Sequence, residues 1–282
     1  MSTSSHSPAP TRGLPSEPRR SDVGRTSTRR TALVVGAAAV VVGLAIYLIG
    51  LPRLLGQPGS TDVGSTPLSS LSLPLALAVA LGGVWVAGSL ATRRAGWRVV
   101  DIVVASVLGV AGGLLFVVWN ANYATLSAPL SATPAVALLG GVWLLPAVLG
   151  GLVIRKPGAA VYTELVAAVL SALVGNQWGF STVWYGLIEG LGAEVVFAVL
   201  LYRRFGLPTA MVAGAVDGAV ISLCDLLLSY PTTSVGWKVG YVVCLAVSGA
   251  LIAGVGSWAL TRALAATGVL APLASGRTAA RV

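Results

Sequence analysis

The sequence has little of the side-chain chemistry on which most enzymes depend. Its 282 residues include one histidine, His6, and two cysteines, Cys224 and Cys244. His6 lies near the N-terminus, so we expect no histidine-based metal site, proton relay or intramembrane hydrolase in the rest of the chain. The cysteines lie in apolar runs without the spacing of a disulfide framework, which favours buried thiols. We therefore expect no enzyme, no metal and no cofactor.

Lysine is also scarce. Lys156 and Lys238 are the two lysines, and neither ends the Gly-x-x-x-x-Gly-Lys-Ser/Thr loop that binds nucleotide phosphates. If the function uses ATP, a partner must hydrolyse it.

Charged residues make up only 10% of the chain, whereas 56% are hydrophobic and the mean hydropathy is +0.87. Such a composition is typical of an integral membrane protein. Apolar runs of about 20 residues must be helices in lipid, so the predicted class is all-α. The net charge of +9 is not gathered on a recognition helix. We therefore expect contact with the lipid bilayer and none with nucleic acid.

The apolar runs predict about eight spans. They cover residues 31–51, 71–91, 99–119, 133–154, 159–174, 182–202, 207–228 and 239–264. Nearly all arginines fall at alternate ends of these spans, which predicts a multi-pass protein of the cell (plasma) membrane with both termini cytoplasmic.

The same pattern predicts four parts. Residues 1–30 form a disordered basic tail, because they contain too little apolar surface to fold. Residues 31–95 form a two-helix membrane appendage, residues 96–270 a six-helix substrate-binding core and residues 271–282 a cytoplasmic C-terminal tail.

Carboxylates enter the apolar runs, whereas almost no basic residue does. They are Asp101, Glu164, Glu189, Glu194, Asp217 and Asp225. An ionised side chain is costly in a membrane unless it faces a partner or a watery cavity. The partner can be a proton, a polar network or a cationic ligand. The pattern favours a membrane carrier or receptor for a small molecule.

Aromatic and amide side chains accompany these acids. Tyr185 and Glu189 lie four residues apart and share a helix face, an arrangement that suits an organic cation. Glu189 and Glu194 are about 140° apart around a helix, so at most one of them touches a small ligand directly. Glu164, Asn176, Trp178 and Asp225 lie on segments that can converge on the same outer pocket. The alternatives are that the rings anchor the protein at the membrane interface and that the acids are protonated structural groups.

Ala105, Gly109 and Gly113 recur at intervals of four residues and share one helix face. Such a face allows another helix to approach closely. Packing within the chain and docking to a second membrane subunit are equally favoured by this pattern.

An ordered set of short motifs carries a family resemblance. The motifs are Gly141-Val142-Trp143, Ile154-Arg155-Lys156-Pro157-Gly158-Ala159-Ala160, Glu164-Leu165-Val166-Ala167-Ala168, Gly175-Asn176, Gly190-Leu191-Gly192-Ala193-Glu194 and Cys224-Asp225-Leu226. Over residues 97–270 the sequence resembles the YkoE-type substrate-binding (S) component of energy-coupling factor (ECF) transporters.

The resemblance implies a six-helix S component that binds thiamine or its hydroxymethylpyrimidine (HMP) precursor from outside the cell. It implies partners as well, namely a transmembrane coupling subunit and two cytoplasmic ATPase subunits. It assigns coupling-subunit docking to Ala105, Gly109 and Gly113, and substrate covering to the loop at residues 120–132, which contains Tyr123. The two N-terminal spans have no counterpart in the family pattern.

Residue chemistry and resemblance together predict a substrate site. Glu164, Glu189 or Glu194 would meet the polar and charged parts of the substrate, while Trp143, Trp178 and Tyr185 would stack on its rings. Two alternatives remain open. One is a standalone proton- or cation-coupled secondary transporter that uses Glu164, Glu194 and Asp217 as a relay. The other is a membrane scaffold whose carboxylates are structural.

Overall fold

A computed structural model of the protein describes residues 34, 36–39, 41, 72–92 and 96–279. Every regular element in these residues is a helix, which confirms the all-α class. The elements are α3 (Ser72–Thr92), α4 (Val99–Ser127), η1 (Ala128–Leu130), η2 (Pro134–Val142), α5 (Leu145–Ile154), α6 (Ala159–Val174), α7 (Ser181–Val199), α8 (Leu207–Leu228), α9 (Val235–Ser248), η3 (Gly249–Val255), α10 (Gly256–Ala266) and α11 (Ala274–Ala279).

Within the described residues, six helical segments are long and apolar enough to cross a membrane. They are formed by α3, by α4 with η1, by η2 with α5, by α7, by α8 and by α9 with η3 and α10. Helix α6 is apolar but shorter, with 16 residues. Most of the predicted first span, residues 31–51, and the predicted tail at 1–30 lie outside the described residues. The eight-span count and the two-helix appendage stay predictions.

Two helices have the bounds that the sequence predicts. Helix α6 covers residues 159–174 between Gly158 and Gly175, both of which have positive φ angles. Glycine adopts this conformation without a steric cost and so ends helices cleanly. Helix α8 covers residues 207–228 and has a proline near its start, where the missing N–H costs nothing.

Helix α4 is longer than predicted. It continues to Ser127, so residues 120–127 of the expected covering loop are helical instead. The sequence from Asn120 to Ser127 has no glycine or proline, and the first residue that disfavours a helix is Pro129. Asn120 and Tyr123 therefore lie on a helix rather than in a loop.

The expected single helix over residues 133–154 is divided. Residues Pro134–Val142 form the 3₁₀ helix η2 and Leu145–Ile154 form α5. Pro146 has no N–H to donate to the preceding turn, so a continuous α-helix is interrupted there. The interruption places Trp143 at the junction of the two helices.

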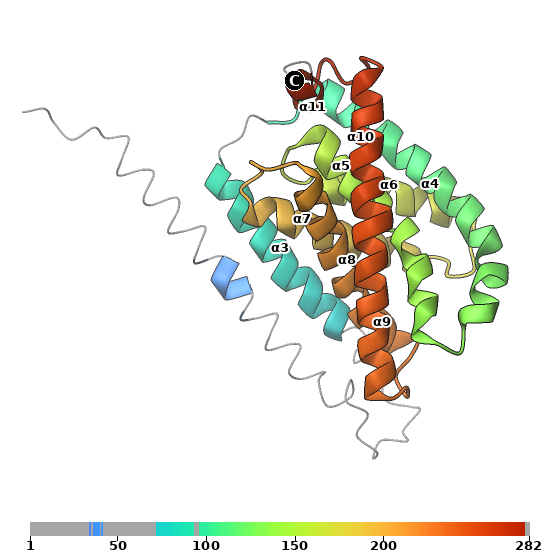
Figure 1. The fold of residues 1–282 in the computed structure, drawn as a ribbon. Coiled ribbons are helices and arrows are strands. Elements are labelled where there is room, and N and C mark those ends of the chain that lie inside the picture. The colour runs from blue at the N-terminus through green and yellow to red at the C-terminus, as the bar shows by residue number, and fades with distance from the viewer. Residues whose placement is uncertain (1–33, 35, 40, 42–71, 93–95, 280–282) are drawn as a thin grey trace, which may run out of the picture.

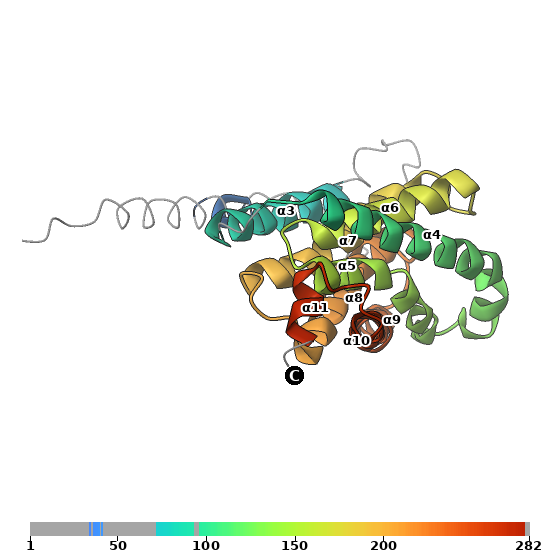
Figure 2. The same ribbon diagram turned by 90° about the horizontal axis from the view of Figure 1, so that it is seen from above.

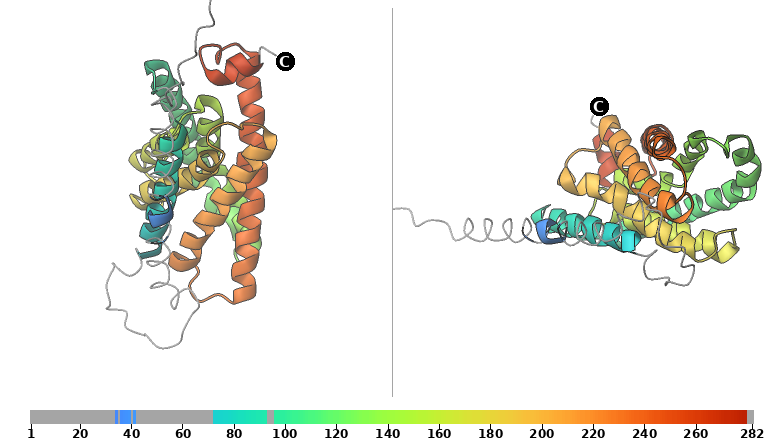
Figure 3. Two further views of the ribbon diagram at one scale, coloured as in Figure 1. Left: turned by 90° about the vertical axis from the view of Figure 1, so that its left-hand side faces the viewer. Right: turned by 90° about the horizontal axis from the view of Figure 1, so that it is seen from below.

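The helices form layers. Helices α9 and α10 with η3 make one continuous rod, which Figure 1 shows along its length and Figure 2 shows end-on. Helices α3, α4 and α6 lie on the side opposite this rod, with α5, α7 and α8 between them (Figures 2 and 3). Helix α11 lies near the start of α4.

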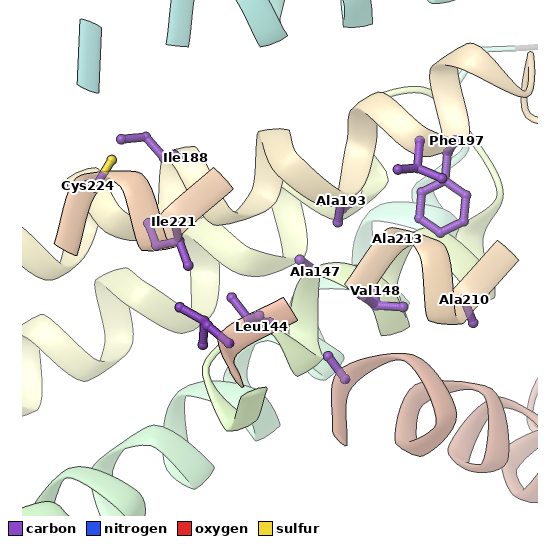
Figure 4. Close-up of a cluster of buried hydrophobic side chains, with 14 of the residues drawn as sticks. Leu144, Ala147, Val148, Ile188, Ala193, Phe197, Ala210, Ala213, Ile221 and Cys224 are labelled. Carbon is purple, nitrogen blue, oxygen red and sulfur yellow. The ribbon is translucent and has the colours of Figure 1, made fainter. Parts of the chain in front are cut away.

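The apolar core is centred on α7 and α8. Ile188, Ala193 and Phe197 of α7 and Ile221, Ala213 and Ala210 of α8 belong to one buried cluster (Figure 4). Residues of η2, α5, α6, α9 and η3 also belong to it. Close packing of this cluster fixes the rotation of α7 and α8 about their axes. That rotation decides which of their acidic side chains face an open space.

Candidate functional site

A cavity of about 380 Å³ lies among α4, η2, α7, α8 and α9. Helix α4 contributes Phe116, Asn120 and Tyr123 to its wall. These positions are separated by four and three residues, so they share one helix face. The extension of α4 beyond the predicted end is what brings Tyr123 to the cavity.

Helices α7 and α8 line the cavity with the same periodicity. Tyr185 and Glu189 project from α7, and Ile221 and Asp225 project from α8. Each pair is four residues apart, as the sequence predicts for Tyr185 and Glu189. The structure thus brings together Glu189 and Asp225, two acids that lie 36 positions apart in the sequence.

Three aromatic rings form one wall of the cavity. The ring centroids of Tyr123 and Trp143 are 5.0 Å apart, and Trp178 lies 5.5 Å from each of them. All three rings line the cavity. Such edge-to-face and tilted contacts stabilise a ring cluster beyond its apolar burial.

A second ring cluster lies at the junction of α8 and α9. The centroid of Tyr230 is 4.7 Å from that of Trp237 and 5.2 Å from that of Tyr241, and Trp237 stacks on Tyr241 at 5.2 Å. Tyr230 and Tyr241 line the cavity. Tyr230 lies outside the spans, and there burial and the nearby Asp225 carboxylate raise the pKa of its hydroxyl.

The cavity is acidic. The hydroxyl of Tyr241 donates a 2.8 Å hydrogen bond to Oδ2 of Asp225. Glu189 faces the same cavity and is 7% exposed. No lysine or arginine of the described segments lines the wall. An organic cation is the complementary ligand, since the acids neutralise it and ring faces attract it.

Most basic residues of the described segments lie at the other ends of the helices, and Lys238, near the start of α9, is the exception. Arg98 caps the start of α4, Arg155 follows α5, Arg203 and Arg204 follow α7, and Arg262 lies in α10. The cavity residues lie toward the end of α4 and α8 and the start of α7 and α9. The acidic cavity and the basic termini therefore occupy opposite ends of the helices.

Two of the acids predicted for the site lie elsewhere. Glu164 is fully buried, and its Oε2 accepts a 2.8 Å hydrogen bond from the N–H of Ala147. Glu194 accepts hydrogen bonds from the N–H groups of Gly158 and Ala160 and from the hydroxyl of Tyr202. Glu194 thus satisfies the free N–H groups at the start of α6, where negative charge is also favoured. Neither side chain lines the cavity.

Asn176 also lies outside the cavity but shapes its rim. Its Oδ1 accepts hydrogen bonds from the N–H of Trp178 at 2.9 Å and from Oγ1 of Thr182 at 3.1 Å. Its Nδ2 donates to Oγ of Ser171. These contacts fix the turn between α6 and α7 and hence the place of the Trp178 ring.

Asn120, Tyr230 and Tyr241 are cavity residues that the sequence prediction did not assign to the site. Nδ2 of Asn120 donates to Ser171, and its Oδ1 accepts a 2.9 Å hydrogen bond from Nε1 of Trp143. Asn120 and Tyr230 lie near the ends of apolar runs, a position that they share with many other residues. Tyr241 lies inside an apolar run, where the sequence gives no sign of a role in binding. Only the hydrogen bond to Asp225 in the structure identifies it as a residue of the site.

The small residues of α4 pack inside the chain. Ala105 is fully buried, and a Cβ atom on Gly109 would lie 2.8 Å from the carbonyl oxygen of Thr163. A Cβ atom on Gly113 would lie 2.9 Å from the carbonyl oxygen of Ala167. The structure shows the first of the two interpretations of these small residues, close packing within the chain. The helix that packs against them is α6.

No group of three or more histidine, cysteine, aspartate or glutamate side chains in the described ranges is arranged to hold a metal ion.

Comparisons with known proteins are consistent with this architecture. The chain is 33% identical over 182 residues to the "Putative HMP/thiamine permease protein YkoE" of Bacillus subtilis (strain 168). The match covers 64% of this chain and 91% of that protein. The chain belongs to the YkoE family. The family resemblance of the sequence motifs is thereby confirmed.

Further matches agree with membership of the YkoE family. A solved structure described as "Crystal structure of an S-component of ECF transporter" is 32% identical, with a TM-score of 0.63. The similarity covers 66% of this chain and 94% of that one. A family model described as "ABC-type cobalt transport system, permease component" matches residues 100–220. This YkoE-type S component is a multi-pass protein of the plasma membrane, and its relatives are transporter components rather than enzymes.

Proposed function

We propose that the cavity binds thiamine or its HMP precursor and that the protein delivers this substrate to an ATP-driven ECF importer. The observation that carries the proposal is the joint placement of Glu189 and Asp225 between two aromatic clusters, with no basic side chain from the described segments on the wall. Thiamine combines a cationic ring with an aminopyrimidine. Acids and ring faces complement both parts.

The size of the cavity supports the proposal. Its volume of about 380 Å³ lies in the range of roughly 300–1,000 Å³ that is common for small-molecule sites. We assign direct contact with the substrate to Glu189, Asp225, Tyr185, Trp143, Trp178 and Tyr123. Three other predicted residues would support the site without touching the substrate, namely Glu164, Glu194 and Asn176. Their hydrogen bonds hold α5, α6 and the turn before α7 in place.

The distribution of charge supports an orientation. Basic residues are concentrated on the cytoplasmic side of membrane proteins. The arginine-bearing helix ends would therefore face the cytoplasm and the cavity would open toward the outside, with both termini inside. Helix α3 and the apolar run at 31–51 would then add two spans to the six-helix core and complete eight.

Transport in this proposal requires a membrane coupling subunit and two cytoplasmic ATPases. The S-component match supports this assembly. Docking through Ala105, Gly109 and Gly113 would require α4 to part from α6, since α6 occupies that face.

Tryptophan fluorescence of the purified protein tests substrate binding. Trp143 and Trp178 line the cavity, whereas Trp184 lies outside it and is largely exposed. We expect thiamine or HMP to change the emission, with a smaller change in Trp178→Phe and an unchanged response in Trp184→Phe. No change in emission and no rise in melting temperature with either compound would contradict the proposal.

An uptake assay tests the mode of transport. We expect uptake only in cells that also express the coupling subunit and ATPases. Uptake by this chain alone under a proton gradient would favour the secondary-transporter alternative instead.

A further inference from the structure

The two acids of the cavity differ in how their charge is stabilised. Asp225 accepts the hydrogen bond of Tyr241 at 2.8 Å, an interaction that favours the carboxylate form. Glu189 is 7% exposed, and no N–H or O–H of the described residues donates a hydrogen bond to it. An ionised carboxylate in this position would depend on the cavity alone for solvation, because no neighbouring donor among the described residues stabilises its charge.

The groups that face Glu189 make its ionisation still less favourable. Helix α6 contributes Glu164, and α8 contributes Asp217, Cys224 and Asp225, all within electrostatic range of Glu189. Its own helix contributes Tyr185. The remaining walls, from α4 and α9, present the tyrosines Tyr123 and Tyr241. None of these groups carries a positive charge.

Asp217 and Glu164 are two further acids near Glu189, and neither forms an ion pair with a described lysine or arginine. Both are fully buried. Among the residues that the structure describes, both oxygens of Asp217 and Oε1 of Glu164 have no hydrogen-bond partner. Carboxyl groups in such positions remain protonated, because an unpaired buried charge is far more costly than a proton. If Glu189 ionises beside the charged Asp225, a cation must enter the cavity to balance the second negative charge.

We propose that Glu189 holds a proton in the empty cavity and releases it when an organic cation binds. The O–H bond of the Glu189 carboxyl group breaks, the proton leaves to solvent through the cavity, and the new carboxylate pairs with the bound cation. Binding is then an exchange of one cation for one proton. Asp225 is not the source, because its charge is stabilised by Tyr241 before the ligand arrives. This inference rests on the proposed function, since it takes a thiamine-like cation as the ligand.

Isothermal titration calorimetry of the full-length protein measures the exchange. Thiamine is titrated at one pH in two buffers, one with a small and one with a large enthalpy of ionisation. We expect release of about one proton per thiamine bound, and an affinity that rises by up to about tenfold per pH unit while Glu189 is protonated. HMP has the same aminopyrimidine without the cationic ring, so its binding should release no proton.

Two variants identify the source of the proton. Glu189→Gln should bind thiamine more weakly and release no proton, whereas Asp217→Asn, which alters an acid outside the cavity, should leave the release unchanged. Thiamine binding without proton release in the unmodified protein would overturn the inference alone, as would unchanged release in Glu189→Gln. Failure of both thiamine and HMP to bind would overturn the proposed function together with it. The pH dependence of the unmodified protein tests the exchange even if the variant is unstable.

Discussion

Tyr241 of α9 donates its hydroxyl hydrogen to Oδ2 of Asp225 on α8 over a distance of 2.8 Å. The contact joins two helices at the wall of the cavity and orients the carboxylate that faces it. The ring of Tyr241 is held independently, because it stacks on Trp237 with centroids 5.2 Å apart. The hydroxyl can therefore be removed while the ring remains in place.

Replacing Tyr241 by phenylalanine should weaken the binding of thiamine. The hydrogen bond forms before the ligand binds, so only part of the about 1.5–3 kcal/mol that such a bond contributes should appear in binding, and we expect the affinity to fall by roughly threefold to tenfold. The matched control is Tyr162→Phe, because Tyr162 also hydrogen-bonds through its hydroxyl, to Ser106, but lies outside the cavity. Calorimetry of both variants checks the prediction. Equal affinities in the two would exclude a role for the Tyr241 hydroxyl in binding.

Replacing Trp178 by leucine should reduce the affinity for both thiamine and HMP. The ring touches Tyr123 and Trp143 across the aromatic cluster and offers a face to either compound. We expect a loss of about 1–2 kcal/mol, or roughly fivefold to thirtyfold. Trp184→Leu removes an exposed ring away from the cavity and should leave the affinity unchanged. A similar loss in both variants would point to a general effect on the fold.

Replacing Glu194 by glutamine should lower stability more than binding. Its oxygens accept three hydrogen bonds, from Gly158, Ala160 and Tyr202, and glutamine offers one acceptor oxygen instead of two. Leaving a buried donor without a partner costs about 1–3 kcal/mol. We expect a melting temperature several degrees lower, measured by thermal unfolding in detergent, with substrate affinity within about twofold of the original. A large loss of affinity at unchanged stability would instead favour direct contact of Glu194 with the substrate.

Replacing Gly109 by alanine should force α4 away from α6. The new methyl group would lie 2.6 Å from Cβ of Val166 and 2.8 Å from a backbone oxygen, and the backbone cannot yield without moving the helix. Overpacking of this kind costs about 1–3 kcal/mol. Gly82→Ala on α3 is the control, because no atom of the described residues lies within 4 Å of its new methyl group. Thermal unfolding should show a decrease for the first variant and no decrease for the second.

Much of the helix pattern could be predicted from the sequence. The bounds of α6 and α8 follow from glycines and a proline at their ends, and the class follows from the length of the apolar runs. The division of residues 133–154 into η2 and α5 was not predicted, because a hydropathy pattern records how apolar a run is and not how its backbone is wound. For the same reason, the hydropathy pattern did not predict that residues 120–127 are helical.

The sequence predicts the chemistry of the site but not which residues form it. Sequence patterns select Glu164, Glu189, Glu194 and Asp225 alike, since each is an acid in an apolar run. Only packing separates them, because it turns Glu189 and Asp225 toward the cavity and directs Glu164 and Glu194 to backbone N–H groups.

The sequence by itself determined that this protein is a helical membrane protein of the YkoE type with acids among its spans. Those properties depend on the length, polarity and order of residues, which a linear pattern records completely. Only the tertiary structure decided that two of the acids share one space with two aromatic clusters. The physical reason is that the rotation of each helix is set by close contacts with its neighbours, and these join residues far apart in the chain.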